Sequence, residues 1–210
     1  MSPTSPLRTV SPSVAGSPRI GVLALQGDVR EHTAVLEALG AVVRPVRRPA
    51  ELAAVAGLVI PGGESTTIDK LSRAFGLQQP IRDAIDGGMP VLGTCAGLIL
   101  LADRVADAAE GQESFGGLDV VVRRNAFGRQ TESFEGEIDV AVLGAPPVTA
   151  AFIRGPVVES VGAAAETIAA LPDGRVVAVE QSGLLGLSFH PEITGEMRFH
   201  RRFLAHVRAR

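Results

Sequence analysis

The sequence has no tryptophan, no tyrosine and one cysteine, Cys95, among its 210 residues. Because a lone cysteine has no partner within the chain, an internal disulfide is excluded, and nothing indicates an oxidising compartment or a thiolate metal cluster. Because eight phenylalanines are the only residues of the Phe, Tyr and Trp types, the chain has few aromatic faces on which bases could stack, and a single-strand nucleic-acid binder is not expected. Excess positive charge is also absent, since the formal net charge is −3, so no nucleic-acid partner is expected. These absences leave open what the one thiol does.

The first 18 residues differ from the rest of the chain. Residues 1–18 are rich in proline and serine and contain no acidic residue. They lack the apolar run of a secretory signal and the helical period of a membrane span, so we expect an extended tail, no membrane association and a cytoplasmic location. Residues 19–210 fit one domain, and 46% hydrophobic residues in the chain suffice for a sizeable core.

Short apolar runs alternate with helical patterns in the first half of this domain. Strands are predicted at residues 20–25, 41–46, 57–60 and 90–93. Between them, Asp28 is the expected N-cap of one helix, and Ile68, Leu71 and Phe75 are spaced as the buried stripe of another. Strands that are apolar throughout and separated by helices indicate a parallel sheet covered on both faces. The predicted fold class is therefore α/β, a three-layer sandwich with a central, mostly parallel sheet flanked by helices.

Strand patterns dominate the second half, at residues 118–123, 136–142, 148–153, 167–171, 176–180 and 184–189. Asp173-Gly174 is the predicted hairpin turn between two of them. The chain closes with a helix whose apolar face begins at Phe199 and ends at Val207. Arginines on its opposite face could contact nucleic acid, but a solvated face is the favoured interpretation. His200 and His206 are expected at the surface beside them.

Cys95 stands in a pattern that is typical of a nucleophile elbow. Residues 93–97 read GTCAG, after a predicted buried strand and before the apolar helical run 98–102. The flanking glycines allow a sharp strand–turn–helix bend, which would place a cysteine thiolate at a helix N-terminus. The alternative is a small buried cysteine between tightly packed glycines, and the five-residue pattern favours the nucleophile.

A cysteine nucleophile needs a base, and the base needs a partner that orients it. His190 is the preferred base because Pro191 and Glu192 follow it directly at the end of a predicted strand. In extended backbone, residues two apart point the same way, so the carboxylate would lie beside the imidazole and set its tautomer. The tripeptide alone is weak evidence, and it gains specificity from the cysteine elbow.

The third element is the sequence PGGES at residues 61–65, again directly after a buried strand. Glycine lets a backbone N–H approach a reacting carbonyl, so Gly63 and Ala96 are the predicted donors of an oxyanion hole. The alternative is a plain strand-to-helix turn with Ser65 or Thr66 as N-cap, and both interpretations can hold at once. No cluster has metal-ligand spacing and no phosphate-binding loop is present, so neither a metal nor another cofactor is expected.

Together these motifs resemble the class I, triad-type glutamine amidotransferases. Longer segments resemble one family within that class, the glutaminase subunits of two-component pyridoxal phosphate synthases. These segments are GVLALQGDVREH (21–32), PGGESTT (61–67), GTCAGLILLA (93–102), RNAFGRQ (124–130) and FIRGP (152–156). The resemblance covers nearly everything outside the tail.

The resemblance implies hydrolysis of L-glutamine to L-glutamate and ammonia, which passes to a separate (β/α)8-barrel synthase subunit that builds pyridoxal phosphate. Cys95, His190 and Glu192 would be the catalytic triad. The glutamine site would be lined by Gly63, Glu64, Ser65, Arg124, Ile153 and Arg154. Guanidinium groups suit the α-carboxylate of glutamine, although the sequence does not assign either arginine to a ligand atom. Gln26 and Gly27 lie in the segment that would face the synthase.

Two alternatives remain at this point. One is another cysteine-dependent α/β amidase, against which His190-Pro-Glu192 and the longer segments argue. The other is a catalytically silent docking subunit, which the loss of a triad member would have favoured. Ammonia release by the wild type and by Cys95→Ala, with the synthase present, separates catalysis from silent docking.

Overall fold

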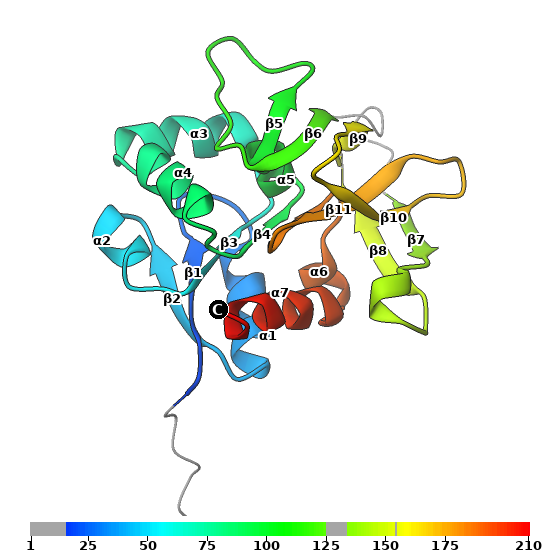
Figure 1. Cartoon of the computed structure of the whole chain (residues 1–210), viewed down its shortest axis with the longest axis horizontal. Coiled ribbons are helices and arrows are strands. Elements are labelled where there is room, and N and C mark those ends of the chain that lie inside the picture. Colours follow the sequence, from blue (N-terminus) through cyan, green and yellow to red (C-terminus); the bar gives the residue numbers. More distant parts are fainter. Residues whose placement is uncertain (1–15, 125–133, 154) are drawn as a thin grey trace, which may run out of the picture.

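A ten-stranded sheet runs through the molecule (Figure 1). The computed structural model describes residues 16–124, 134–153 and 155–210. The strands of this sheet are β1 (Arg19–Leu23), β2 (Val42–Val46), β3 (Gly57–Ile60), β4 (Val91–Thr94), β5 (Ala102–Val105), β6 (Leu118–Arg123), β9 (Val157–Val161), β10 (Glu166–Ala170), β11 (Val176–Gln181) and β12 (Leu184–Leu187). Their order is β2-β1-β3-β4-β12-β11-β9-β6-β5, and β10 pairs with β11.

Five neighbouring strands, β2-β1-β3-β4-β12, form the parallel half of the sheet. Every residue of β3, β4 and β12 is buried, which explains why their sequences are apolar without alternation. Ile60 pairs with Gly93, and Thr94 pairs with Leu187. The carboxyl ends of β3, β4 and β12 therefore meet at one edge of the sheet, where the predicted motifs follow them.

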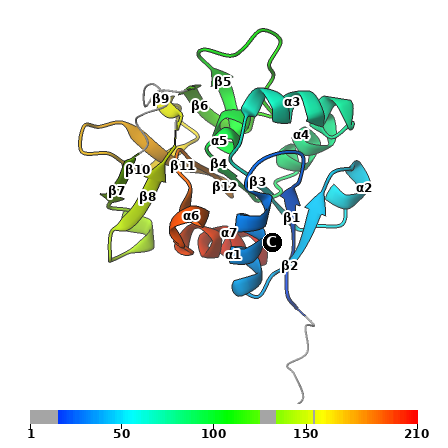
Figure 2. The same ribbon diagram turned by 180° about the vertical axis from the view of Figure 1, so that it is seen from behind.

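Helices cover both faces of the parallel half. On one face α1 (Val29–Ala38) and α7 (Arg198–Arg208) lie side by side (Figure 2). On the other are α2 (Pro49–Leu52), α3 (Ser65–Ala74), α4 (Gln78–Asp86) and α5 (Ala96–Leu101). Each face has its own apolar cluster, with Phe203 of α7 in one and Ile81 of α4 in the other, both fully buried. Burial of one such side chain contributes about 1.5–3 kcal/mol. The predicted α/β class, with a mostly parallel sheet flanked by helices, is confirmed.

The second half of the chain extends the sheet with mainly antiparallel pairs. β11 pairs antiparallel with β9, β10 and β12, and the turn at Asp173-Gly174 joins β10 to β11 as predicted. A separate two-stranded sheet contains β7 (Phe134–Ile138) and β8 (Val148–Phe152). β5 and β9 were not predicted, and the strand predicted at 136–142 is divided between β7 and the 3₁₀ turn η1 (Ala141–Leu143). Within the described residues, no helix combines the length and apolarity needed to cross a membrane.

Several helix predictions were wrong in detail. Phe75 lies at the C-cap of α3 and is 53% exposed, so the stripe that Ile68 begins does not reach it. His200 is fully buried rather than at the surface, because it lies beside Phe199 on the face of α7 that packs against the sheet. Asp28 is the N-cap residue of α1, as predicted, but its side chain makes no cap hydrogen bond. Its carboxylate points instead toward the edge where the strands end.

Candidate active site

Cys95 lies in a sharp bend between β4 and α5. Its backbone angles are φ 49° and ψ −100°, a region that residues other than glycine rarely adopt. A Cβ on Gly97 would lie 2.2 Å from the carbonyl oxygen of Ile60, and a Cβ on Gly93 would lie 2.6 Å from the carbonyl carbon of Gly97. Both flanking residues must therefore be glycine for the bend to pack against the sheet. The predicted strand–turn–helix geometry is present.

The strained backbone of Cys95 is held by neighbours on both sides. Its N–H donates to the carbonyl of Leu187 in β12 at 2.7 Å, and its own carbonyl accepts from the N–H of Ile99 in α5 at 3.3 Å. A backbone in such a region costs on the order of 1–3 kcal/mol and persists when its surroundings fix it. The Cys95 side chain is consequently presented at the carboxyl edge of the sheet.

His190 follows β12 at the same edge and stands beside Cys95. Its Nδ1 lies 2.8 Å from Oε1 of Glu192, and its backbone N–H donates to the carbonyl of Ala151 in β8 at 3.1 Å. The expected extended backbone is wrong, because His190 is the N-cap of α6 (Pro191–Thr194), where Pro191 is the first residue. The predicted contact between the imidazole and the carboxylate nevertheless forms.

A second carboxylate, that of the N-cap residue Asp28, also reaches this imidazole. Oδ2 of Asp28 lies 3.3 Å from Nδ1 of His190. Ligand atoms of Asp28, His190 and Glu192 lie within 4.8 Å of one another, a spacing that could also hold a metal ion. Both carboxylates therefore face Nδ1 of His190, and both stabilise a proton on that nitrogen.

The pKa values reflect this environment. Burial alone would lower the pKa of His190, because it penalises the imidazolium. Hydrogen bonds with Asp28, Cys95 and Glu192 outweigh burial and raise that pKa to about 12. Burial raises the pKa of Glu192, and its contact with His190 offsets part of that effect. At neutral pH His190 is therefore protonated, and it is hydrogen-bonded to Cys95.

The turn after β3 passes directly over the imidazole. A Cβ on Gly62 would lie 2.3 Å from Cε1 of His190, so any side chain there would displace the imidazole. The next helix, α3, is capped by Glu64, whose carboxylate accepts from the N–H groups of Thr66 and Thr67. The alternative N-caps, Ser65 and Thr66, are therefore wrong. Burial acts to raise the pKa of Glu64, but these hydrogen bonds outweigh it and lower the pKa.

Gln26 and Gly27 pack against this same turn. The side-chain oxygen of Gln26 accepts from the N–H of Glu64 at 2.7 Å. A Cβ on Gly27 would lie 1.7 Å from the carbonyl oxygen of Gly62, and a Cβ on Gly63 would lie 2.5 Å from Oε1 of Gln26. Both Gly27 and Gly63 also have positive φ, 104° and 151°. The end of β1 and the glycine turn thus form one closely fitted unit.

A cavity of about 500 Å³ opens in front of Cys95. It is lined by Gln26, Asp28, Gly63, Glu64, Ser65, Cys95, Ile99, Arg124, Ile153, His190 and Ile193. Glu192 is buried behind His190, Ala96 is buried at the start of α5, and Gly27 adjoins Gln26. Arg154 lies outside the described residues. Asp28, Ile99 and Ile193 are lining residues that were not predicted. Gln26 also lines the cavity, although it was predicted only for the partner-facing segment.

Arg124 is held in the wall of this cavity by a chain of hydrogen bonds. Its Nη1 donates to Oε1 of Gln112 at 2.8 Å, and Nε2 of Gln112 donates to Oγ of Ser65 at 3.0 Å. Its Nη2 lies 3.4 Å from a carboxylate oxygen of Glu64. The side chain is 15% exposed, so it is not a surface arginine. Gln112 was missed because it lies in a loop without any motif.

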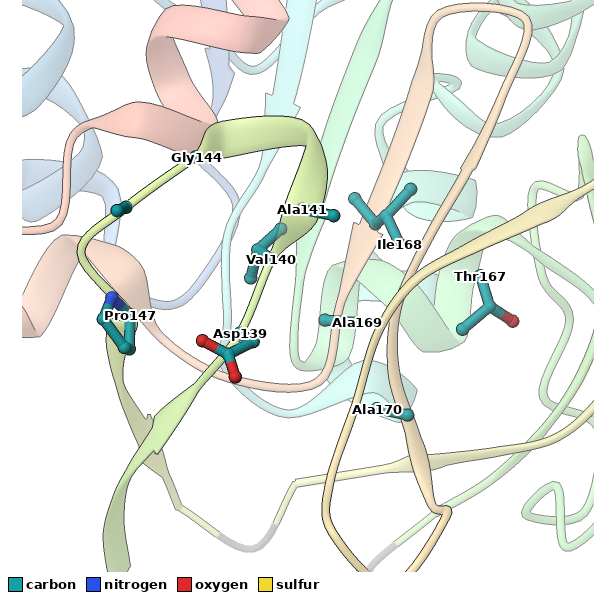
Figure 3. A pocket seen from close by; sticks show the side chains of 10 residues that line it. Asp139, Val140, Ala141, Gly144, Pro147, Thr167, Ile168, Ala169 and Ala170 are labelled. Atoms are coloured by element: carbon teal, nitrogen blue, oxygen red, sulfur yellow. The ribbon is translucent and has the colours of Figure 1, made fainter.

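Another cavity, of about 440 Å³, lies beside η1 and β10 (Figure 3). Its walls are mostly small apolar residues such as Ala141 and Ala169, and Asp139 is the one charged side chain among its lining residues. No cysteine or histidine lines it. Because it holds neither the predicted nucleophile nor the predicted base, the cavity at Cys95 is the candidate active site.

Comparison with known proteins agrees with this geometry. The model of the SNO glutamine amidotransferase family matches residues 22–209. A protein of Clavibacter sepedonicus named pyridoxal 5'-phosphate synthase subunit PdxT is 66% identical over 187 residues, which cover 89% of this chain and 90% of that protein. A protein of the same name from Streptomyces avermitilis is 60% identical, covering 92% of this chain and 96% of its own length.

Solved structures with the same fold are also known. One described as a glutamine amidotransferase superposes with a TM-score of 0.83 at 44% identity, covering 90% of this chain and 98% of the other. A protein from Thermoplasma acidophilum described as part of a GMP synthase has a TM-score of 0.66 at 18% identity, covering 92% and 95% of the two chains. The latter likeness shows the fold alone.

Proposed function

The chain belongs to the SNO glutamine amidotransferase family, and from this premise we propose how its site works. It hydrolyses L-glutamine to L-glutamate and ammonia and delivers the ammonia to a partner synthase subunit for pyridoxal 5'-phosphate biosynthesis. We assign Cys95 as the nucleophile, His190 as the acid and base, and Glu192 as the carboxylate that orients His190. The observation that carries this assignment is the hydrogen-bonded series Cys95–His190–Glu192 at the cavity.

The reaction follows from the thiolate–imidazolium pair. The sulfur of Cys95 attacks the side-chain carbonyl carbon of glutamine, and the oxyanion is bound by the N–H groups of Gly63 and Ala96. His190 gives its proton to the nitrogen as the C–N bond breaks, which releases ammonia and leaves a glutamyl thioester. His190 then takes a proton from water, whose oxygen attacks the thioester. The C–S bond breaks, glutamate leaves, and the Cys95 thiolate beside protonated His190 is restored. No metal or other cofactor is needed.

The walls of the cavity suit the rest of the substrate. A volume of about 500 Å³ is within the usual range for a small-molecule site. We propose that Arg124 and Arg154 supply positive charge for the α-carboxylate, and that Glu64 supplies negative charge for the α-ammonium. Gly63, Ser65 and Ile153 would complete the glutamine site. In support, Arg124 is held by Gln112 and Glu64 at the cavity, which preorganises its guanidinium.

We propose that Gln26 and Gly27 face the synthase partner, which is a (β/α)8 barrel, and link docking to catalysis. They fit closely against Gly62 and Gly63, so a shift of one segment moves the other. Docking would align the Gly63 N–H for the oxyanion. One missing donor costs about 2.7–4 kcal/mol in the transition state, so the free subunit would be nearly idle. Glutamine hydrolysis measured with and without the synthase tests this, and equal rates would remove the coupling.

The catalytic assignment is tested with Cys95→Ala. Ammonia release from glutamine in the presence of the synthase should be abolished, whereas the complex should still form. Retained ammonia release would refute the assignment, and a wild type without activity in the complex would favour the silent docking subunit. We also propose that residues 19–210 are the catalytic domain, that residues 1–18 lie outside it, and that the protein is cytoplasmic. A cytoplasmic location would provide the reducing conditions that keep Cys95 from being oxidised, as its role as nucleophile requires.

A further inference from the structure

Two buried histidines lie directly behind the triad. His32 of α1 and His200 of α7 are both fully buried, although 168 residues separate them in the sequence. Nδ1 of His32 lies 2.9 Å from Nε2 of His200, which is hydrogen-bond distance. Imidazoles are rarely removed from water without a partner, because an unpaired buried polar group is costly. The proposed catalytic steps do not use this pair.

The second ring nitrogen of His32 points at the active site. Its Nε2 lies 3.0 Å from Oγ1 of Thr94 and 3.5 Å from Oε1 of Glu192. Oε1 of Glu192 is the same oxygen that contacts His190, and no described residue is a hydrogen-bond partner of Oε2. His32 thus lies near the very oxygen of Glu192 that orients His190.

Thr94 connects the same histidine to the glycine turn. Oγ1 of Thr94 accepts from the N–H of Gly62 at 3.0 Å. Thr94 also immediately precedes Cys95 at the end of β4. One imidazole thus contacts the carboxylate of the triad and the hydroxyl that holds the turn over His190.

The position of the proton on His32 follows from these neighbours. If Nε2 carries the hydrogen, it faces the negative oxygen of Glu192 and the hydroxyl of Thr94, and Nδ1 accepts from Nε2–H of His200. The buried atom without a partner is then Nδ1 of His200, as an acceptor. The opposite tautomer would bury an unpaired N–H there and would turn a lone pair of His32 toward a carboxylate. Each tautomer leaves one buried hydrogen without an acceptor among the described residues, the Thr94 O–H in the first case and Nδ1–H of His200 in the second. The contact that decides is therefore the one between Nε2 of His32 and the carboxylate oxygen of Glu192, which favours Nε2–H on His32.

We propose that His32 is a positioning residue of this glutaminase: its Nε2–H, oriented by His200, holds Oε1 of Glu192 and the Thr94 hydroxyl, and so fixes the orientation of His190. The inference rests on the proposed function. The two quantities that it concerns, the position of the proton on His32 and the proton affinity of His190, can be measured without glutamine hydrolysis.

The surroundings keep His32 uncharged. Burial lowers its pKa well below the usual 6.5, and the neighbouring His200 and His190 lower it further. Burial lowers the pKa of His200 to about 4, with Glu196 acting in the opposite direction. The titratable groups that face His190 are the carboxyl groups of Asp28 and Glu192 and the sulfur of Cys95. A neutral His32 can hold Glu192 without adding a positive charge that would compete with His190 for it.

Two matched substitutions separate the contacts of His32. The amide of His32→Gln can reach the position of Nε2, whereas the amide of His32→Asn reaches only that of Nδ1. We would label the full chain with ¹⁵N-histidine and follow the imidazole nitrogens by NMR across pH, which is tractable because the chain has four histidines. His206→Gln is the control, since His206 lies on the same helix as His200 but pairs with Glu180.

The wild type should show a neutral His32 with its proton on Nε2. In His32→Asn the proton affinity of His190 should fall at least tenfold, and His32→Gln should restore most of it. Glu192→Gln should cause a similar fall, and adding His32→Asn to it should cause little more, because both act through one carboxylate. With the synthase present, His32→Asn should lower kcat at least tenfold and leave KM within about twofold.

Two results would overturn the proposal. One is a wild-type His32 with its proton on Nδ1, a measurement that needs no variant to fold. The other is a folded His32→Asn protein in which His190 titrates as in the wild type. Neither readout uses glutamine turnover, so a failure of the proposed function would appear separately, as a wild type whose histidines behave as expected but which releases no ammonia.

Discussion

Replacement of Gly62 by alanine should displace His190, the proposed base, without disturbing the fold. The φ angle of Gly62 is outside the left-handed region, so alanine can adopt its backbone. The added Cβ would lie 2.3 Å from Cε1 of His190 and 2.9 Å from Oδ2 of Asp28. Ordinary carbon–carbon contact begins at about 3.5 Å, so the imidazole must move by about 1 Å.

A displacement of that size predicts a specific loss of rate. A misplacement of 1 Å at a reacting group can cost about 10²-fold, equivalent to about 2.7 kcal/mol of transition-state stabilisation. We therefore expect kcat for glutamine hydrolysis, measured with the synthase, to fall by about 10²-fold in Gly62→Ala. The thermal midpoint should change little, because the shift is confined to the site.

Gly40→Ala is the control for this experiment. Gly40 has a φ of 81° and no neighbour within 4 Å of an added Cβ, so alanine there strains the backbone without a clash. It should lose about 1 kcal/mol of stability and keep its rate. A Gly62→Ala enzyme with a rate within twofold of the wild type would refute the reasoning, since His190 would not need its observed position.

Three further results are expected. The lowered pKa of His200, about 4, means that its stabilising effect is present above pH 6.5 and lost as the pH falls toward 4. Between pH 7 and 4.5 the wild type should therefore lose about 2–3 kcal/mol more unfolding free energy, measured with urea, than His200→Gln, and equal losses would contradict this. Arg124→Gln should raise KM for glutamine about 10–100-fold with kcat nearly unchanged, and a selective loss of kcat would exclude a binding role. Gly97→Ala, whose Cβ would lie 2.2 Å from the Ile60 carbonyl, should destabilise the protein by about 1–3 kcal/mol or more in thermal unfolding, and unchanged stability would be inconsistent with the packing of the elbow.

The parts of the site that are local in sequence could be predicted. The elbow at Cys95 needs only a buried strand, two glycines and a following helix, all of which are adjacent in the chain. His190 and Glu192 are two residues apart, so their contact survives even though the backbone between them is a helix start rather than an extended strand. In parallel sheets the strand ends meet at one edge, which brings the motifs together.

The parts that depend on distant contacts could not be predicted. His200 was expected at the surface because arginines flank it, and only its packing against His32 of another helix shows that it is buried. Asp28 has the residue type of a helix cap, yet its carboxylate meets an imidazole 162 positions away. Phe75 fits the helical spacing but follows the last turn of α3, where the packed face has ended.

The most direct test of the central claim is to trap the intermediate on Cys95. The complex with the synthase is mixed with isotopically labelled glutamine, quenched in acid within the first turnover and digested, and the peptides are analysed by mass spectrometry. A labelled glutamyl thioester is expected on the peptide that contains Cys95, and it should be absent from Cys95→Ser. Ammonia release by the wild type with the label on another residue, or undiminished release by Cys95→Ser, would contradict the account.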